Sequence, residues 1–207
     1  MLKTKIAVLV SGGGTNLQAL IDAQEKGMLK SGEITLVISS SNTAFALERA
    51  KKYGIPTATV SKKACANQAE FEHEIQASLI GHGAQLVVLA GFMSILSAEF
   101  VAKWPKRIIN VHPSLIPSFC GEGFYGLRVH EAALEYGVKV TGATVHFVNE
   151  IPDGGEIILQ KSEPVHKHDT PETLQKRVME RAEWIILPRA AELVSKNILK
   201  EGSDYGN

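Results

Sequence analysis

The sequence has little cysteine, no excess of either charge and no long apolar run, and each absence excludes a class of protein. Its two cysteines, Cys65 and Cys120, lie far apart and form no CxxC pair, so there is neither a disulfide framework nor a zinc signature. Lys plus Arg and Asp plus Glu both number 22, which gives no electrostatic reason to bind nucleic acid or an anionic membrane. We therefore expect small-molecule partners.

No apolar stretch approaches the roughly 20 residues that a bilayer span needs, so we expect a soluble protein. The N-terminal residues 1–10 lack a signal-peptide cleavage pattern and are interpreted as the approach to a first strand. The scarcity of cysteine is compatible with a reducing cytoplasm. A length of 207 residues is typical of one domain, and we expect residues 1–207 to form it, with only 202–207 expected to fray.

Strand-like and helix-like patterns alternate along the first half of the chain. Strands are expected at the apolar runs 6–10, 34–39, 57–60 and 86–90, and at 108–112. Residues with helical spacing lie between them, at 17–21, 44–53, 71–79 and 97–103. Such alternation predicts an α/β protein with a Rossmann-like, mostly parallel sheet, helices on both faces and right-handed crossovers.

The pattern changes after residue 117. A helix is expected at about 129–136, and two further strands, 140–148 and 156–164, flank a polar turn and are expected to add to the sheet in antiparallel fashion. A long terminal helix is expected to begin at Thr170, because Thr170 to Thr173 resembles a capping box and Pro171 suits a first helical turn.

A glycine-rich turn, 11–16, joins the first strand to the first helix. Free backbone N–H groups at a helix N-terminus bind anions. The dinucleotide fingerprint is incomplete, because Leu17 replaces its third glycine and serines 39–41 stand where an acidic residue would end the second strand. A P-loop would need a Lys-Ser or Lys-Thr pair, which is absent. The turn is interpreted as a monophosphate site, or else as an ordinary turn in which Asn16 caps the helix.

The run 108–112 places an amide and an imidazole, Asn110 and His112, at alternating positions, so both point to one face of a strand. Pro113 and Pro117 then prevent the strand from continuing. The end of a parallel strand is where α/β proteins bind ligands. Taken singly, each side chain has an ordinary interpretation as a polar residue at a strand end.

The turn 149–155 is rich in residues typical of surface turns. Paired with His112, however, its Asp153 would supply the carboxylate that orients or charges an imidazole in acyl transfer. His146 lies between apolar residues and is interpreted as a packed histidine rather than a catalyst. Cys120 has no base placed beside it by sequence, which disfavours a role as nucleophile.

Five segments together resemble the folate-dependent formyltransferase family, and they span nearly the whole chain: 11–18, 89–97, 110–117, 142–148 and 153–155. The resemblance implies the formyltransferase fold. It also implies transfer of a formyl group from 10-formyltetrahydrofolate, the cosubstrate, to the amine of glycinamide ribonucleotide in purine (IMP) synthesis, without a metal.

The resemblance implies roles for particular residues. Asn110, His112 and Asp153 match the family's catalytic trio. Gly14, Thr15 and Asn16 match its ribonucleotide phosphate loop, and Glu183 matches the acid that holds the sugar hydroxyls. The positions that match the folate pocket are Met93, Ser94, Ile95, Leu96, Asn110, Asn149, Glu150, Ile151, Pro152 and Asp153. For Met93, Ile95 and Leu96 the sequence alone favours ordinary core.

On this basis residues 1–100 are the phosphate-binding half, and 101–207 the catalytic and folate-binding half. The chain departs from the family pattern at Pro152, where an aliphatic residue is usual, and at Ser94, where arginine is common. The family's arginine near Gln68 is not recognisable either, which leaves the contacts of the folate tail open. The long, glycine-rich segment 119–125 is hypothesised to be a lid. We expect a monomer or a homodimer.

Other functions are also compatible with parts of this pattern. An enzyme that acts on another amino sugar nucleotide is one, but it would not explain Asn16 and Glu183 together. A 10-formyltetrahydrofolate hydrolase would carry an additional N-terminal regulatory domain, and a methionyl-tRNA formyltransferase an additional basic C-terminal domain, and we expect neither here. A catalytically silent nucleotide-binding module of the same fold should show degeneration at Asn110, His112 or Asp153, and all three are intact.

Overall fold

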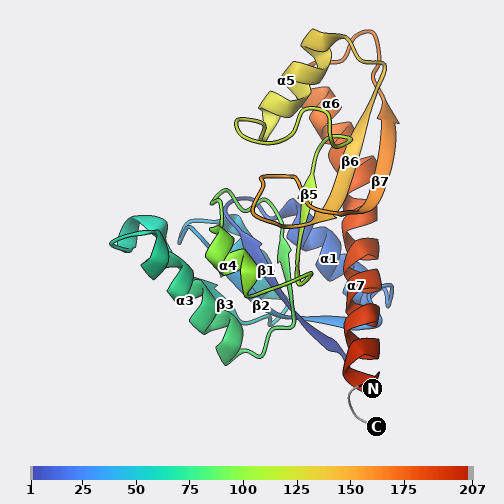
Figure 1. Ribbon diagram of the computed structural model, residues 1–207. Helices are drawn as coiled ribbons and strands as arrows, with labels where there is room; N and C mark the ends of the chain where they lie inside the picture. Colours follow the sequence, from blue (N-terminus) through green and yellow to red (C-terminus); the bar gives the residue numbers. More distant parts are fainter. Residues whose placement is uncertain (1, 205–207) are drawn as a thin grey trace.

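The apolar runs form the strands of a seven-stranded sheet ordered β3-β2-β1-β4-β5-β6-β7, in a computed structural model that describes residues 2–204 (Figure 1). The parallel strands are β1 (Thr4–Val10), β2 (Gly32–Ser39), β3 (Thr57–Thr59), β4 (Leu86–Leu89) and β5 (Ile108–His112). The last two, β6 (Val140–Phe147) and β7 (Ile157–Pro164), are antiparallel. The expected mostly parallel sheet with an antiparallel C-terminal addition is confirmed.

Helices cover both faces of this sheet, because successive side chains of the buried strands point to opposite sides. Ile6 and Val8 of β1 pack with α1 (Thr15–Glu25), α2 (Phe45–Lys52) and the C-terminal helices. Ala7 and Leu9 pack on the other side, with α3 (Gln68–Gly81) and α4 (Ala98–Ala102). A turn of 3-10 helix, Lys62–Ala64, precedes α3. The hydrophobic clusters on the two faces of the sheet fix the positions of the strand ends that carry the predicted site residues.

The strand order reverses between β1 and β4. The chain leaves β1 through α1 toward β2 on one side, and it returns through α3 to β4 on the other. The glycine turn 11–14 and the segment 91–97 therefore diverge from neighbouring strands at the same edge of the sheet. Crevices of this kind are where open α/β sheets bind ligands.

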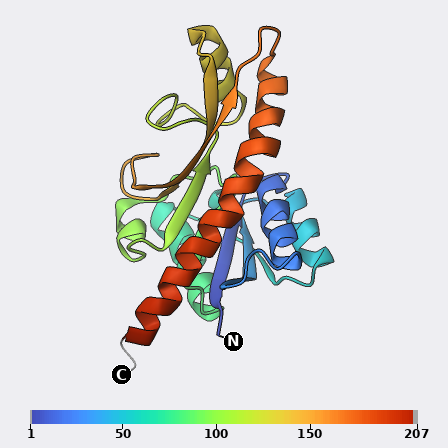
Figure 2. The same ribbon diagram turned by 90° about the vertical axis from the view of Figure 1, so that its right-hand side faces the viewer.

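The C-terminal half adds α5 (Leu127–Tyr136), the antiparallel pair, α6 (Pro171–Val178) and α7 (Trp184–Asp204). The expected capping box is present, with Thr170 and Thr173 bonded reciprocally. The expected single long helix is interrupted: the turn Met179–Glu183 is π-helical, and Pro188 lies within α7. Figure 2 shows α6 and α7 running the length of the molecule along one face of the sheet.

No helix in the described range 2–204 is both long enough and apolar enough to cross a membrane. The stretch 202–207 was expected to fray, but residues 202–204 continue α7, and the last three residues lie outside the described range.

Candidate active site

Strand β5 carries the first two predicted site residues and delivers them at its end. In the antiparallel pairing, Asn110 lies opposite His146, and His112 lies opposite Thr144 of β6. Thr144 also fixes the turn that follows: its hydroxyl donates to the Ser114 carbonyl (2.7 Å) and accepts from the Ile116 N–H (3.1 Å). The prolines stop the strand, and Thr144 determines where the chain goes next.

The loop between β6 and β7 brings Asp153 over β5. Asp153 adopts a left-handed conformation, with φ 55°. Two residues later the loop passes so close to β6 that a Cβ on Gly155 would lie 1.8 Å from the Phe147 carbonyl oxygen. Only glycine fits there, so the sequence Asp-Gly-Gly is what folds this loop back over the strand.

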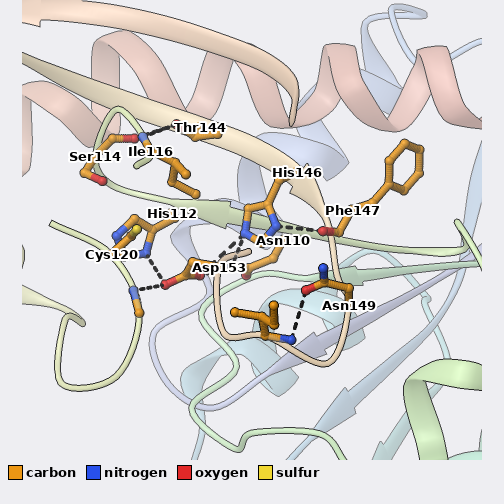
Figure 3. Close-up of polar contacts among 12 residues, drawn as sticks. Asn110, His112, Ser114, Ile116, Cys120, Thr144, His146, Phe147, Asn149 and Asp153 are labelled. Carbon is orange, nitrogen blue, oxygen red and sulfur yellow. Dashed lines mark hydrogen bonds and ion pairs between the residues drawn. The ribbon is translucent and has the colours of Figure 1, made fainter. Parts of the chain in front are cut away.

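The Asp153 carboxylate is the point at which the predicted trio meets (Figure 3). Its Oδ2 accepts the Gly121 N–H at 2.9 Å and lies 3.4 Å from His112 Nδ1. Its Oδ1 lies 3.4 Å from the Asn110 amide nitrogen, which donates to it, and 3.5 Å from His146 Nε2. The structure thus joins Asn110, His112 and Asp153, which are up to 43 residues apart.

The segment hypothesised to be a lid contacts two of these side chains. His112 donates from Nε2 to the Phe119 carbonyl (2.8 Å), and Gly121 donates to Asp153. The Phe119 ring packs edge-on against Phe124 and Tyr136, with centroids 6.4 and 6.0 Å away. In this conformation the segment orients the imidazole and the carboxylate through its backbone.

Burial and local contacts set the charges of the cluster. Burial lowers the pKa of His112 below its ordinary value, although the Asp153 carboxylate and the Phe119 carbonyl oppose the shift. Burial would raise the pKa of Asp153, but contacts with His146, His112 and the Gly121 N–H outweigh it and lower that pKa. At neutral pH the carboxylate is ionised and the ring is mostly neutral. Since Nε2–H is bonded to Phe119, a further proton would bind Nδ1, beside the carboxylate.

Three residues that sequence reasoning did not place in the site belong to its structure. His146 is buried, as expected, but its Nε2 also lies 3.3 Å from the Asn110 amide nitrogen. Thr144 fixes the turn. His130 of α5 is fully buried in the cavity wall, and neither of its ring nitrogens has a hydrogen-bond partner among the described residues. Burial lowers the pKa of His130 to about 4. In the sequence, only the two-residue spacing of Thr144 and His146, which places them on the same face of a strand, could have indicated that these two belong to the site.

The trio opens onto a cavity of about 940 Å³, within the range usual for small-molecule sites. Its lining includes every predicted folate residue: Met93, Ser94, Ile95, Leu96, Asn110, Asn149, Glu150, Ile151, Pro152 and Asp153. The alternative of ordinary core is wrong for Met93 and Ile95, which are 58% and 68% exposed, and right for Leu96, which is buried in a hydrophobic cluster.

Thr15, Asn16 and Glu183 also line the cavity. The interpretation of Asn16 as a helix cap is wrong. Gly14 is the N-cap of α1 (φ 70°), and the Asn16 amide instead donates to Glu183 Oε2 at 2.7 Å. Burial raises the pKa of Glu183, which projects from the π-helical turn, a feature frequent at functional sites. Gly14 does not itself line the cavity; a Cβ there would lie 2.6 Å from Cβ of Ala46.

The Cys120 thiol donates to the Pro117 carbonyl, and burial together with Asp153 raises its pKa. That keeps it protonated and a poor nucleophile. In the described part of the chain, no group of three or more His, Cys, Asp or Glu is arranged to hold a metal ion.

An Asn-His-Asp cluster at a strand end, facing a cavity that is also lined by a helix N-terminus, is suited to the transfer of a group between small molecules. The family model described as formyl transferase matches residues 4–191, and the chain belongs to this family.

Particular relatives narrow the comparison. The chain is 41% identical over 184 residues to phosphoribosylglycinamide formyltransferase of Haemophilus influenzae, covering 89% of this chain and 84% of that one. It is 45% identical over 202 residues to the human trifunctional purine biosynthetic protein adenosine-3, covering 98% of this chain but only 19% of the relative, about a fifth of its length. The crystal structure of glycinamide ribonucleotide transformylase 1 from Symbiobacterium toebii superposes with a TM-score of 0.88 at 39% identity, covering 94% of this chain and 89% of that one.

Proposed function

We propose that this protein transfers the formyl group of 10-formyltetrahydrofolate to the amine of N1-(5-phospho-D-ribosyl)glycinamide, giving the N2-formyl product and tetrahydrofolate in de novo IMP synthesis. The observation that carries the proposal is that Asn110, His112 and Asp153 meet in the wall of a cavity that is also lined by a helix N-terminus and Glu183. The name of the relative at 41% identity, phosphoribosylglycinamide formyltransferase, supports the same reaction, and the name of the relative at 45% identity supports a place in purine biosynthesis.

The ribonucleotide fits the end of the cavity beside α1. Backbone N–H groups of the first turn, which begins after Gly14, would bind the phosphate together with Thr15 and Asn16, because these donors have no partner within the helix. Glu183 would accept hydrogen bonds from the ribose hydroxyls. Its bond from Asn16 links the sugar site to the phosphate site.

The folate fits the other end of the cavity. Met93, Ile95 and Ile151 are all more than half exposed there, so a flat pterin could cover apolar surface that the protein leaves uncovered. The backbone of 93–96 and of 149–153 would supply the polar contacts that fix orientation, as in most small-molecule sites.

The chemistry follows from the cluster. The substrate amine attacks the formyl carbon, and the carbonyl oxygen takes on negative charge in the tetrahedral intermediate. The Asn110 amide and the Nε2–H of His112, in place of its present bond to the Phe119 carbonyl, would donate to that oxygen. The attacking amine must lose a proton and the departing folate nitrogen must gain one. Asp153 would stabilise the His112 ring when it carries the extra proton, and it would help to move the proton, through water.

Several broader expectations are part of the proposal. The 1–207 stretch would act as one unit, with ribonucleotide phosphate bound by the half 1–100 and catalysis and folate binding in the half 101–207. We further propose a cytoplasmic protein, monomeric or homodimeric, that binds neither nucleic acid nor membranes, consistent with its balanced charge of 22 basic and 22 acidic residues.

The deciding assay follows tetrahydrofolate production with and without glycinamide ribonucleotide. Ribonucleotide-dependent production together with the formylated product is the expected result. Production that does not need the ribonucleotide would identify a 10-formyltetrahydrofolate hydrolase instead. No production, while the ribonucleotide still binds, would identify a catalytically silent binding module.

A further inference from the structure

A buried carboxylate on α3 holds the segment 91–97 that lines the cavity. Glu72 is only 8% exposed, yet it belongs to neither substrate end of the cavity. It accepts three hydrogen bonds: from the Ser97 N–H (2.6 Å), from the Ser97 hydroxyl (2.5 Å) and from Nε2 of Gln68 (2.6 Å). A carboxylate buried this deeply is stable only when its oxygens are bonded in this way, so Glu72 and Ser97 constrain each other.

Gln68 adds a direct hydrogen bond from α3 to the backbone of the segment 91–97. The same amide nitrogen that donates to Glu72 donates to the Ile95 carbonyl at 3.1 Å. Ser97 in turn accepts the Phe100 N–H (3.2 Å) and caps α4. The backbone is therefore tied to α3 at residues 95 and 97, on both sides of Leu96.

The opposite end of the segment is tied to the glycine turn. The Met93 N–H donates to the Ser11 hydroxyl (2.9 Å), and the Ser11 N–H donates to the Gly91 carbonyl (3.1 Å). Two side chains between these ties, Met93 and Ile95, are mostly exposed in the cavity. Exposed apolar side chains gain little from packing, so hydrogen bonds to the backbone must set the conformation that presents them.

We propose that Glu72 and Gln68 are positioning residues for the folate: neither lines the cavity, but they hold 93–97 in the conformation that receives the pterin. The proposal rests on the proposed function and deepens it, because it assigns part of the folate affinity to α3. The hydrogen bonds of the Glu72 and Gln68 side chains go to each other, to Ser97 and to Ile95, and none of them reaches Thr15, Asn16 or Glu183.

The size of the effect follows from the populations of the segment. A ligand that binds only one conformation has its affinity reduced by the fraction of molecules in that conformation. Without the three hydrogen bonds to Glu72, only a minor fraction of the molecules would have the segment in the conformation that binds folate. If it fell to about a tenth of the population, the KM for 10-formyltetrahydrofolate would rise about tenfold, with kcat and the ribonucleotide KM within about twofold of wild type.

The test compares Glu72→Ala, Glu72→Gln and Gln68→Ala with the control Glu74→Ala, whose side chain is 58% exposed on the same helix. KM for each substrate and kcat are measured in steady state, and tetrahydrofolate and glycinamide ribonucleotide are each titrated calorimetrically. Glu72→Gln keeps an acceptor for the Ser97 N–H, so it should recover most of the folate affinity. Gln68→Ala loses the bond to the Ile95 carbonyl and one of the three bonds to Glu72, but it keeps both bonds from Ser97 to Glu72. It should therefore give a smaller, folate-specific rise in KM.

A folate-specific loss of affinity in Glu72→Ala, partial in Gln68→Ala and absent in Glu74→Ala, supports the proposal. Unchanged tetrahydrofolate affinity in the folded variants, or equal weakening of both ligands, overturns it and leaves Glu72 a purely structural residue. If Glu72→Ala does not fold, Gln68→Ala decides, because its side chain is partly exposed at the start of α3. Failure of the wild-type protein to bind tetrahydrofolate would overturn the proposed function before any variant is compared.

Discussion

Replacing Asp153 by asparagine is the sharpest test of the cluster, because the amide keeps the shape of the side chain and changes what its two ends can do. In the structure one oxygen faces the Gly121 N–H and His112, and the other faces Asn110 and His146. An asparagine must turn its NH2 group toward one of these two sides. The Gly121 bond is the shortest contact, at 2.9 Å, so we expect the NH2 to face Asn110.

That orientation sets two donors against each other and moves the Asn110 amide away from the position in which it would meet the formyl oxygen. The variant also loses the negative charge that would stabilise a proton on His112 Nδ1. Loss of one donor to a developing oxyanion typically lowers turnover about 100- to 1,000-fold, or about 3 to 4 kcal/mol in the activation free energy. We expect Asp153→Asn to lose at least this much turnover.

The assay measures kcat from tetrahydrofolate production at saturating concentrations of both substrates, and ribonucleotide affinity by calorimetric titration. Ribonucleotide binding should survive, because Thr15, Asn16 and Glu183 make no contact with Asp153. The control is Glu156→Gln. Glu156 lies at the end of the same loop, and its exposed carboxylate pairs with Lys106. Turnover of Asp153→Asn near that of the control would refute the assigned role, and so would loss of ribonucleotide binding equal to the loss of turnover.

Three further outcomes are expected. His112→Ala should lower turnover at least about 100-fold with ribonucleotide binding kept, and kcat near the wild-type value would contradict its role as a donor. Glu183→Gln should raise the ribonucleotide KM while leaving Tm at pH 7 unchanged or higher, since burial raises the pKa of this carboxyl and its ionised form therefore costs stability; a lower Tm with unchanged KM would show a structural role. Arg177 lowers the pKa of Asp169 from 3.8 to about 2. The stability from this pair is therefore fully present above about pH 4 and is lost as the pH falls toward 2. Asp169→Asn should cost about 1 to 2 kcal/mol in urea unfolding at pH 7 and little at pH 2, and an equal cost at both pH values would exclude the ion pair as the cause.

Much of the fold could be predicted from residue patterns because the parallel strands are buried on both faces. Runs such as 6–10 and 86–90 are apolar throughout for that reason. The interruption at Met179–Glu183 could not be predicted in the same way. Leu174 and Val178 keep helical spacing on its N-terminal side, and a widened turn changes hydrogen bonding without changing which residues are apolar.

The limits of sequence reasoning are clearest for the polar residues. A capping side chain and a ligand-binding side chain look alike in sequence, so Asn16 was open to both interpretations until its bond to Glu183, 167 residues away, was seen. His146 was correctly expected to be buried, but its contact with Asp153 depends on the register between β5 and β6. A shift of one residue in that register would turn it to the opposite face.

The class of fold, the strand end that carries Asn110 and His112, and the close turns that require glycine can all be predicted from local sequence patterns, because hydrophobic period, proline and glycine act locally. Tertiary structure alone decided which distant groups meet. It set the Phe119 carbonyl and the Gly121 N–H on His112 and Asp153, and it placed Glu72 beneath the cavity-lining segment. These contacts depend on strand register and loop path, which arise from the packing of the whole sheet rather than from any one segment.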